Sequence, residues 1–265
     1  GALSSIADAG ATSVSVAVSN AGGAMAADSF WDGGTRATAD ATGIALGAGD
    51  DNAASTESIH AAATAHATSV TVAATFSGGL AGAVAASTAT SQAAGMQGGA
   101  GEDVLVNAAD LTAETLSEAQ GVSVTFTPLG ASVAGAYIDN ATTANALSIG
   151  LAGDSGDDVI AIGEGSAMLL EAKARTTNTA VALSLAGMSA AESTAIASAA
   201  VVGLDGGADK DTVVNSGTIR SDLLHADAVA RAVTFTALGL GDATANALGH
   251  AAATGLSGGA GDDRL

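Results

Sequence analysis

Acidic side chains in this chain gather in five short glycine-rich windows, and these are the residues whose type and spacing suit chemistry. The windows begin at Gly43, Gly95, Gly150, Gly203 and Gly255, and the last of them reads GLSGGAGDDRL. They hold twelve of the 27 acidic residues while covering about a fifth of the chain. Solubility does not require such focusing, whereas a site for a hard cation requires oxygen ligands close together. The windows therefore predict cation sites.

The windows recur at a nearly constant distance of 52 to 55 residues. A fixed period of this length is the signature of a repeat architecture. The chain has 265 residues, which is five times 53, and Leu265 falls where Val213 falls in the preceding repeat, so that Gly1 continues at the place of Val214. We expect one repetitive domain over residues 1–265, with repeat boundaries near the five window glycines. Such a chain would be a segment of a longer protein or the building block of a polymer.

Each repeat has three parts that would position the windows. A short apolar stretch follows the window, as in Val104–Leu111, and a second stretch alternates strictly, as in Ser13–Val18 and Ser69–Phe76. A third, alanine-rich stretch returns to the next window. Alternation with a period of two and β-branched residues between glycines predict strands with one face buried. Because alanine is the best helix former, helix stays the minor alternative for Ser189–Ala200.

The fold class we predict is all-β, a right-handed parallel β-solenoid (a β-helix or β-roll) built from five repeats of about 53 residues. Hydrophobic residues make up 48% of the chain but only 2% of it is aromatic, and most of the rest is alanine and valine. Such small side chains fill only a narrow interior. Three parts of roughly 18 residues each suit three coils per repeat, and one larger flattened coil per repeat is equally compatible with the sequence.

The windows resemble the haemolysin-type (RTX) calcium repeat, G-G-x-G-x-D-x-U-x, in which U is a large apolar residue. The last window matches it fully, from Gly258 to Leu265. In the third window Asp154 replaces the second glycine, and in the fourth Asp209 replaces the third glycine. The first window departs most, with Leu46 and Ala53 at the outer positions.

This resemblance implies Ca²⁺ as the bound ion, because glycines let the turn carbonyls face one point and Ca²⁺ takes six to eight hard oxygens. In that family the motifs run in tandem, whereas here each stands alone, so the turns either stack in a row with other coils between them or each binds weakly. The alternative is a tight turn with solvated acids and no metal. The implied metal-site residues are Gly47, Gly49, Asp50, Asp51, Gly98, Gly99, Gly101, Glu102, Asp103, Gly153, Asp154, Gly156, Asp157, Asp158, Asp205, Gly206, Gly207, Asp209, Asp211, Gly258, Gly259, Gly261, Asp262 and Asp263.

A second resemblance lies just after the windows. The segment TVVNSGTI, Thr212–Ile219, and its echo VLVNAADL look like the strand-turn-strand element of autotransporter-type β-helices. Together the two resemblances imply a large secreted bacterial repeat protein, located outside the cell or on its surface.

Composition excludes several classes of function. The net charge of −20 excludes a nucleic acid as partner, since such partners require clustered Lys and Arg. No apolar run approaches the ~20 residues of a membrane span. Cysteine is absent. No nucleophile elbow, phosphate-binding loop or His-Glu-x-x-His motif is present, and equivalent acid pairs recur in four windows, so we expect no enzyme.

Two functions of different classes agree with these features. The first is a structural protein, a calcium-stiffened filament, surface layer or fibre whose partners are copies of itself joined head to tail. The second is an adhesin-like binding module that recognises a glycan, ice or another surface through flat strand faces. The aromatic spot Phe30–Asp32 is either a loop that covers a neighbour or a platform for stacking a ligand. Threonine positions drift between repeats, which favours the structural function.

Overall fold

The computed structural model describes residues 1–20, 22–27, 34–134 and 141–265, so the aromatic spot at residues 30–32 lies outside the described residues. All of its regular elements are strands, which confirms the all-β prediction and excludes helix for Ser189–Ala200. The strands are β1 Leu3–Ser19, β2 Ala24–Ala27, β3 Thr35–Ala48, β4 Asn52–Ser55, β5 Ile59–Thr75, β6 Gly79–Val84, β7 Ser87–Ala100, β8 Val104–Asn107, β9 Leu111–Ala134, β10 Ala141–Ser155, β11 Val159–Ile162, β12 Ala167–Asp205, β13 Thr212–Asn215, β14 Thr218–Arg220 and β15 Leu224–Ser257.

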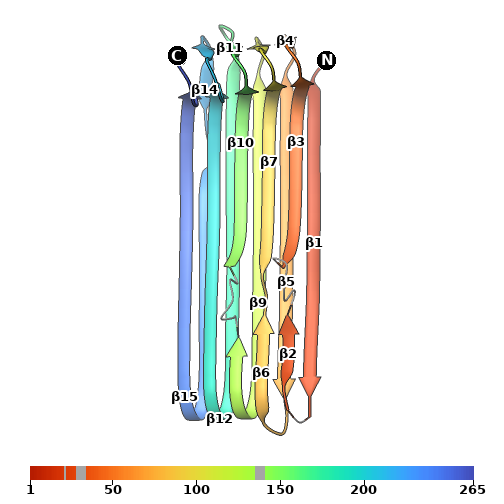
Figure 1. Cartoon of the computed structure of the whole chain (residues 1–265), viewed down its shortest axis with the longest axis vertical. Coiled ribbons are helices and arrows are strands. Elements are labelled where there is room, and N and C mark those ends of the chain that lie inside the picture. The colour runs from red at the N-terminus through yellow and green to blue at the C-terminus, as the bar shows by residue number, and fades with distance from the viewer. Residues whose placement is uncertain (21, 28–33, 135–140) are drawn as a thin grey trace.

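The strands trace long, flat loops that lie side by side (Figure 1). A long strand such as β5 or β9 runs from the edge that carries the acidic windows to the opposite edge, where the chain turns back. A second long strand, such as β7 or β10, returns to the windows, and a four-residue strand such as β8 or β11 then crosses that edge. The three parts expected in each repeat therefore form the three sides of one loop.

Backbone pairing is parallel throughout, and paired residues are about one sequence period apart. Ile59 pairs with Leu111 and Thr88 pairs with Thr143, at separations of 52 and 55 residues. The long strands, together with the short strands β2, β6 and β14, form a nearly closed sheet of eleven strands, as in a parallel β-helix. Strands β13, β11, β8 and β4 form a second sheet. This register decides between the two coil sizes: each period makes one flattened coil and not three.

The interior of the flattened coil is lined by alanine, serine and threonine. In β5 every second residue from Ile59 to Thr75 is buried, and these positions include Ala61, Ser69 and Thr71. Most buried hydroxyls bond one another or backbone groups, as Ser91 Oγ and Ser117 Oγ do at 2.7 Å across the interior, whereas Ser69 Oγ and Thr142 Oγ1 have no hydrogen-bond partner. Small side chains allow the two walls to approach, and the hydrogen bonds of most hydroxyls lower the cost of burying them.

The coil is thicker beside the acidic windows, where a third wall of short strands completes the cross-section. The largest fully buried side chains gather at this end, among them Met96, Leu105, Leu111, Leu151 and Ile160. Three walls enclose more volume than two, so large apolar residues are needed to fill it at normal packing density. This thick end holds the large apolar residues of the core, and the acidic windows lie next to them.

Valines of the alternating segments point outward. At the half of the long strands remote from the windows, Ser and Thr of segments such as Ser69–Phe76 are buried, while the residues between them face solvent. Two outward columns paired in register are Val16, Val72, Val124, Val181, Val233 and Val18, Ala74, Phe126, Leu183, Phe235. We define the apolar margin as these two columns together with Phe76, Leu80, Leu129, Leu185, Met188, Leu238 and Leu240 at the adjoining turn.

Enlarging an inward alanine is expected to be costly because the interior is thin. Ala174 in β12 is fully buried, and Ala174→Leu should lower the free energy of unfolding by about 2–3 kcal/mol through overpacking. The control is Thr177→Leu, at an outward, half-buried position of the same strand, which should change stability by less than about 0.5 kcal/mol. Denaturant titration measures both, and equal effects would contradict the inward and outward assignment.

Candidate functional site

The five acidic windows lie in a row along one edge of the molecule, where the returning strands end and the short strands begin (Figure 1). Parallel pairing continues through the windows, because Gly47 pairs with Gly99 and Asp154 pairs with Gly99 from the other side. Equivalent residues of successive windows therefore stack. The isolated motifs of the sequence come together in a row, as in the first of the two arrangements considered for them, but the windows pair directly, without other coils between them.

The last aspartate of each motif forms a ladder of carboxylates. Each carboxylate accepts, on Oδ1, the backbone N–H of the equivalent aspartate in the preceding window. The four N···O distances are 2.8 Å for Asp51 N to Asp103, 2.7 Å for Asp103 N to Asp158, 2.9 Å for Asp158 N to Asp211 and 3.0 Å for Asp211 N to Asp263. Bonds from N–H to a carboxylate are stronger than neutral ones, so the ladder clamps successive coils together.

The first glycine of the motif makes room for this aspartate. A Cβ added at Gly153 would lie 2.3 Å from Asp158 Oδ2 and 2.4 Å from the carbonyl oxygen of Gly206. Gly98, Gly206 and Gly258 face their own aspartates in the same way. In the first window Leu46 occupies this position, and there Asp51 is only half-buried. The spacing of glycine and aspartate thus has a packing reason that is independent of any metal.

The second and third glycine positions adopt a backbone conformation that other residues rarely accept. Their φ values are positive in every window, for example 111° at Gly99 and 135° at Gly101. The two aspartates that replace glycines follow the same path, with φ of 76° at Asp154 and 84° at Asp209. Aspartate tolerates the left-handed region better than most residues, which explains why the motif departs from glycine at these places and with this residue.

A second, outer set of acids lines the solvent side of the windows. Asp50 Oδ1 accepts the N–H of Glu102 at 3.0 Å, and Asp157 Oδ1 accepts the N–H of Lys210 at 3.1 Å. Asp157 and Lys210 are exposed, and Glu102 and Asp262 continue this outer row. Each window thus offers one inner and one solvated acidic position, except the fourth, where Lys210 takes the outer place. The inner aspartate is buried in the three middle windows and half-buried in the first and the last. Asp205 lies at the end of β12, half-buried.

Stacking carboxylates in the interior has an electrostatic cost. Asp103, Asp158 and Asp211 are at most 1% exposed, and the Oδ2 atom of each lacks a hydrogen-bond partner. Burial raises the pKa of Asp158 from 3.8 to about 6; the hydrogen bond from Asp103 opposes this, and the carboxylates of Asp211 and Asp103 add to it. Burial likewise raises the pKa of Asp211. The ladder therefore favours binding a positive charge, either a proton or a metal cation.

Within the described part of the chain, no group of three or more His, Cys, Asp or Glu side chains is placed to hold a metal ion. A cation at the windows would thus depend on backbone carbonyls for most of its ligands. The unpartnered, buried Oδ2 atoms fit such a cation, because a hard oxygen without a donor is what Ca²⁺ coordinates. The predicted calcium-site residues are brought together in the row of windows, and calcium itself stays a prediction.

Comparisons with known proteins add no assignment. No protein-family model, curated protein or solved structure matches this chain. The resemblance to the RTX repeat accordingly rests on the window residues alone, and the site has to be judged by its own geometry.

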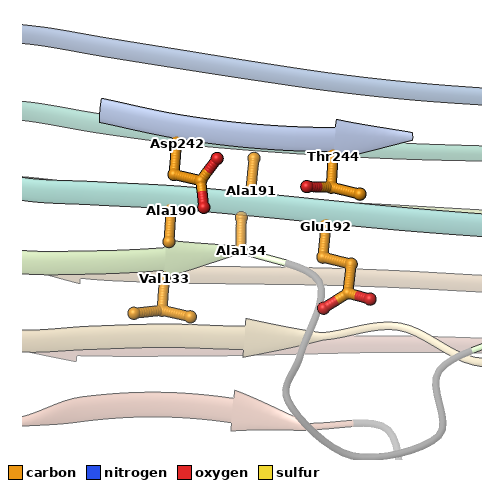
Figure 2. A pocket seen from close by; sticks show the side chains of 7 residues that line it. All are labelled: Val133, Ala134, Ala190, Ala191, Glu192, Asp242 and Thr244. Carbon is orange, nitrogen blue, oxygen red and sulfur yellow. The ribbon is translucent and has the colours of Figure 1, made fainter.

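Other surface features are shallow. One hollow has a volume of about 110 Å³. Figure 2 shows the side chains that line it, with the carboxylates of Glu192 and Asp242 on adjacent strands. A second hollow lies where Glu118 bridges His66 at 3.2 Å and Arg175 at 3.6 Å on the outer face. Such exposed ion pairs contribute about 0–1 kcal/mol, and ligand sites usually enclose ~300 Å³ or more. The prediction that the chain is no enzyme stays a prediction.

The strand-turn-strand element is present at the segment that suggested it. In Thr212–Ile219, strand β13 ends at Asn215 and β14 begins at Thr218. Asn215 Oδ1 accepts the N–H of Gly217 at 3.1 Å, which closes a tight turn. In the described residues, no helix is long and apolar enough to cross a membrane.

Proposed function

We propose that this chain is a structural repeat segment, a right-handed β-solenoid of five repeats of about 53 residues that forms a bacterial extracellular filament, layer or fibre. Its partners are copies of itself, joined head to tail by strand pairing. The extracellular and bacterial setting follows from the resemblance to the calcium repeat and to autotransporter-type β-helices. The features that support the structural role are the edge strands, the dimensions of the coil and the ladder of aspartates.

The observation that carries this proposal is a pair of long open strand edges. Among the described strands, β1 pairs only with β5, and the 34-residue β15 pairs only with β12. Inward residues direct their N–H groups to the next coil, as Ile59 N does to Asp110 O at 3.0 Å. The inward residues of β15, such as Ala228 and Ala247, therefore present N–H groups at the open edge, which is a template for another strand.

The dimensions suit a ribbon. A coil about 20 residues long at ~3.3 Å per residue spans roughly 65 Å, whereas five coils spaced ~4.8 Å apart stack to only about 20–25 Å. Most of the length of an assembly would then come from adding coils along the stacking direction. Such a head-to-tail contact is heterologous, and it propagates when the rotation does not close on itself.

Calcium is part of the proposal as a stabiliser of the windows. The Oδ2 atoms of Asp103, Asp158 and Asp211, together with turn carbonyls, would hold it. Bound Ca²⁺ would supply positive charge beside the stacked carboxylates and so offset their burial, which is the main cause of the raised pKa of Asp158, and the smaller repulsion from neighbouring carboxylates. Asp50, Glu102 and Asp157 would attract the ion from the solvent side.

The adhesin-like alternative requires an unbroken outward array of similar side chains. The best threonine column on the outer face runs Thr12, Thr68, Gln120, Thr177 and Val229. Two of its five residues, Gln120 and Val229, are not threonine, so this column does not form a repeated recognition surface. This column gives the binding-module hypothesis no support beyond the sequence.

Blocking the open edge tests the proposed function. Ala228→Pro together with Ala247→Pro removes two N–H donors from the free side of β15 without touching its pairing to β12. The unmodified chain should form ribbons that lengthen with concentration, and the proline variant should shorten them at least tenfold at equal concentration. Electron microscopy of negatively stained samples measures the lengths.

The matched control for the edge is Ala228→Val with Ala247→Val, which enlarges the same side chains and keeps the donors. This variant should still form ribbons. Head-to-tail stacking would be overturned if the unmodified chain at ~100 µM gave only particles of one molecule. It would also be overturned if the ribbons of the proline variant were as long as those of the unmodified chain.

A further inference from the structure

The apolar margin is an outward surface, separate from the open edges, that the proposed function leaves unexplained. It consists of the outer face of the long strands near the glycine turns and of those turns themselves. The paired valines, Val124 with Val181 and Val181 with Val233, form one of its ridges. Phe76 and Phe126 form part of another, with ring centroids 6.5 Å apart. These side chains run across all the long strands.

The margin is exposed on inner strands and turns as well as on the end strands β1 and β15, which carry six of its exposed large side chains: Val16, Val18, Val233, Phe235, Leu238 and Leu240. Phe76, Leu129, Leu185 and Met188 belong to strands or turns that have a neighbour on both sides, yet they are 57%, 58%, 49% and 59% exposed. A soluble protein rarely exposes so continuous an apolar surface unless something covers it. The interior is already filled by Ala, Ser and Thr, so these side chains have no place to turn inward.

Charge is segregated away from this surface. The acidic windows lie at the opposite edge, roughly 45 Å from the two columns and roughly 65 Å from the turns at ~3.3 Å per residue. The two columns of the margin contain no charged residue, and its rim is marked by Arg231 on one face and by Asp242, seen in Figure 2, on the other. A molecule of charge −20 can therefore approach a second copy through the margin with the acidic edges of both far apart.

The area is sufficient for a stable contact. Eleven of the large apolar side chains that are exposed belong to the margin. A large side chain covers roughly 150 Å² or more when buried, and about half of each is exposed here, so the margin offers roughly 800 Å². This equals the ~800 Å² per partner of a standard interface. Each coil contributes one residue to each column of the margin, so a contact between two copies would extend along the whole stack of coils.

We propose that the apolar margin is a lateral self-association surface, through which a second copy of this chain packs sheet against sheet in an isologous contact. The acidic edges then face outward on both sides of the pair. Lateral pairing doubles the width of an assembly, whereas edge pairing lengthens it. The two contacts use different residues and are separable by experiment.

The test removes the apolar character of the margin while keeping strand-forming side chains. The margin variant combines Val124→Thr, Phe126→Thr, Val181→Thr and Leu183→Thr. It is made in the background of Ala228→Pro with Ala247→Pro, so that axial stacking does not contribute. Analytical ultracentrifugation of the background chain should show a dimer at tens of micromolar, and the margin variant should weaken dimerisation at least tenfold. Circular dichroism spectra of both should agree.

The control makes the same kind of change on the other outer face, with Leu147→Thr, Ile149→Thr and Val202→Thr. These residues are outward and half-buried in β10 and β12, and the dimer should persist. A background chain that stays monomeric at 200 µM, or a margin variant that dimerises as before, would overturn the proposal. Flotation of the chain with phosphatidylcholine vesicles, without a dimer in solution, would also overturn it in favour of a lipid surface. None of these outcomes affects ribbon length, which tests the proposed function separately.

Discussion

Gly187→Ala is expected to destabilise the fold by about 4 kcal/mol or more, the largest effect of any single small substitution we identify. Gly187 lies in the turn opposite the acidic windows with φ of 132°, and an added Cβ would lie 2.0 Å from the carbonyl oxygen of Gly130. The strained conformation alone costs about 1–3 kcal/mol. Because the clash is with the backbone of the neighbouring coil, relief requires the two coils to separate.

The matched control is Gly10→Ala in β1, where an added Cβ meets nothing within 4 Å and φ is not in the left-handed region. This substitution should be neutral or stabilise by up to about 1 kcal/mol, since alanine reduces the freedom of the unfolded chain. Thermal unfolding followed by circular dichroism compares the two. Equal melting temperatures for the two variants would mean that the glycine turns are not stacked as described.

Asp158→Asn is expected to stabilise the calcium-free protein at pH 7.5 by about 2–3 kcal/mol. The folded pKa of Asp158 is raised to about 6, so its contribution to stability is fully present below the ordinary value of 3.8 and is lost as pH rises through about 6. A shift of about two pKa units corresponds to ~3 kcal/mol. Asparagine keeps the acceptor for Asp103 N–H and carries no charge. In chelator, the unmodified chain should become more stable as pH falls from 7.5 to 4, and the variant should gain less.

With calcium bound at the windows, the unmodified chain should be more stable than Asp158→Asn, the reverse of the order expected in chelator. Ca²⁺ at millimolar concentration should raise the melting temperature of the unmodified chain at pH 7.5, because it binds the folded state alone. Asp158→Asn should reduce that response. Acidification to pH 5 should then release the ion and lower stability in its presence. A melting curve of the unmodified chain that is the same in Ca²⁺ and in chelator would contradict the calcium proposal.

The sequence predicted the strands, their parallel pairing and the place of the turns, because these depend on local signals, and it left the row of windows as one of two alternatives. Period-two alternation identifies strands, and glycines at fixed spacing identify turns, whatever lies around them. The residue types at the windows also marked the right turns, since Asp154 and Asp209, which replace the second and third glycines, keep the positive φ of those positions.

What the sequence left undecided depends on how far apart the walls are. Hydropathy alone places the valines of Ser69–Phe76 inside, whereas the structure buries Ser69 and Thr71 and turns Val70 and Val72 outward. A two-walled coil is too thin for valine on both walls, so the smaller residue of each pair takes the interior. The burial of Asp158 and its hydrogen bond from Asp103 N–H could not be predicted either. A motif gives residue types and spacing, but it does not show which neighbouring coil supplies the N–H.

Fibre diffraction from aligned assemblies of the 265-residue chain tests the central claim, continuous stacking of flat coils, most directly. The structure predicts a reflection near 4.8 Å along the ribbon axis, from parallel strands that run across it, and a ribbon or paired-ribbon width that is a multiple of roughly 65 Å in micrographs of the same sample. For Ala228→Pro with Ala247→Pro, the 4.8 Å reflection should lose its axial orientation, because separate five-coil molecules keep the spacing but do not align. Material that gives no axial 4.8 Å repeat, or one perpendicular to the long axis of the assembly, would contradict the account.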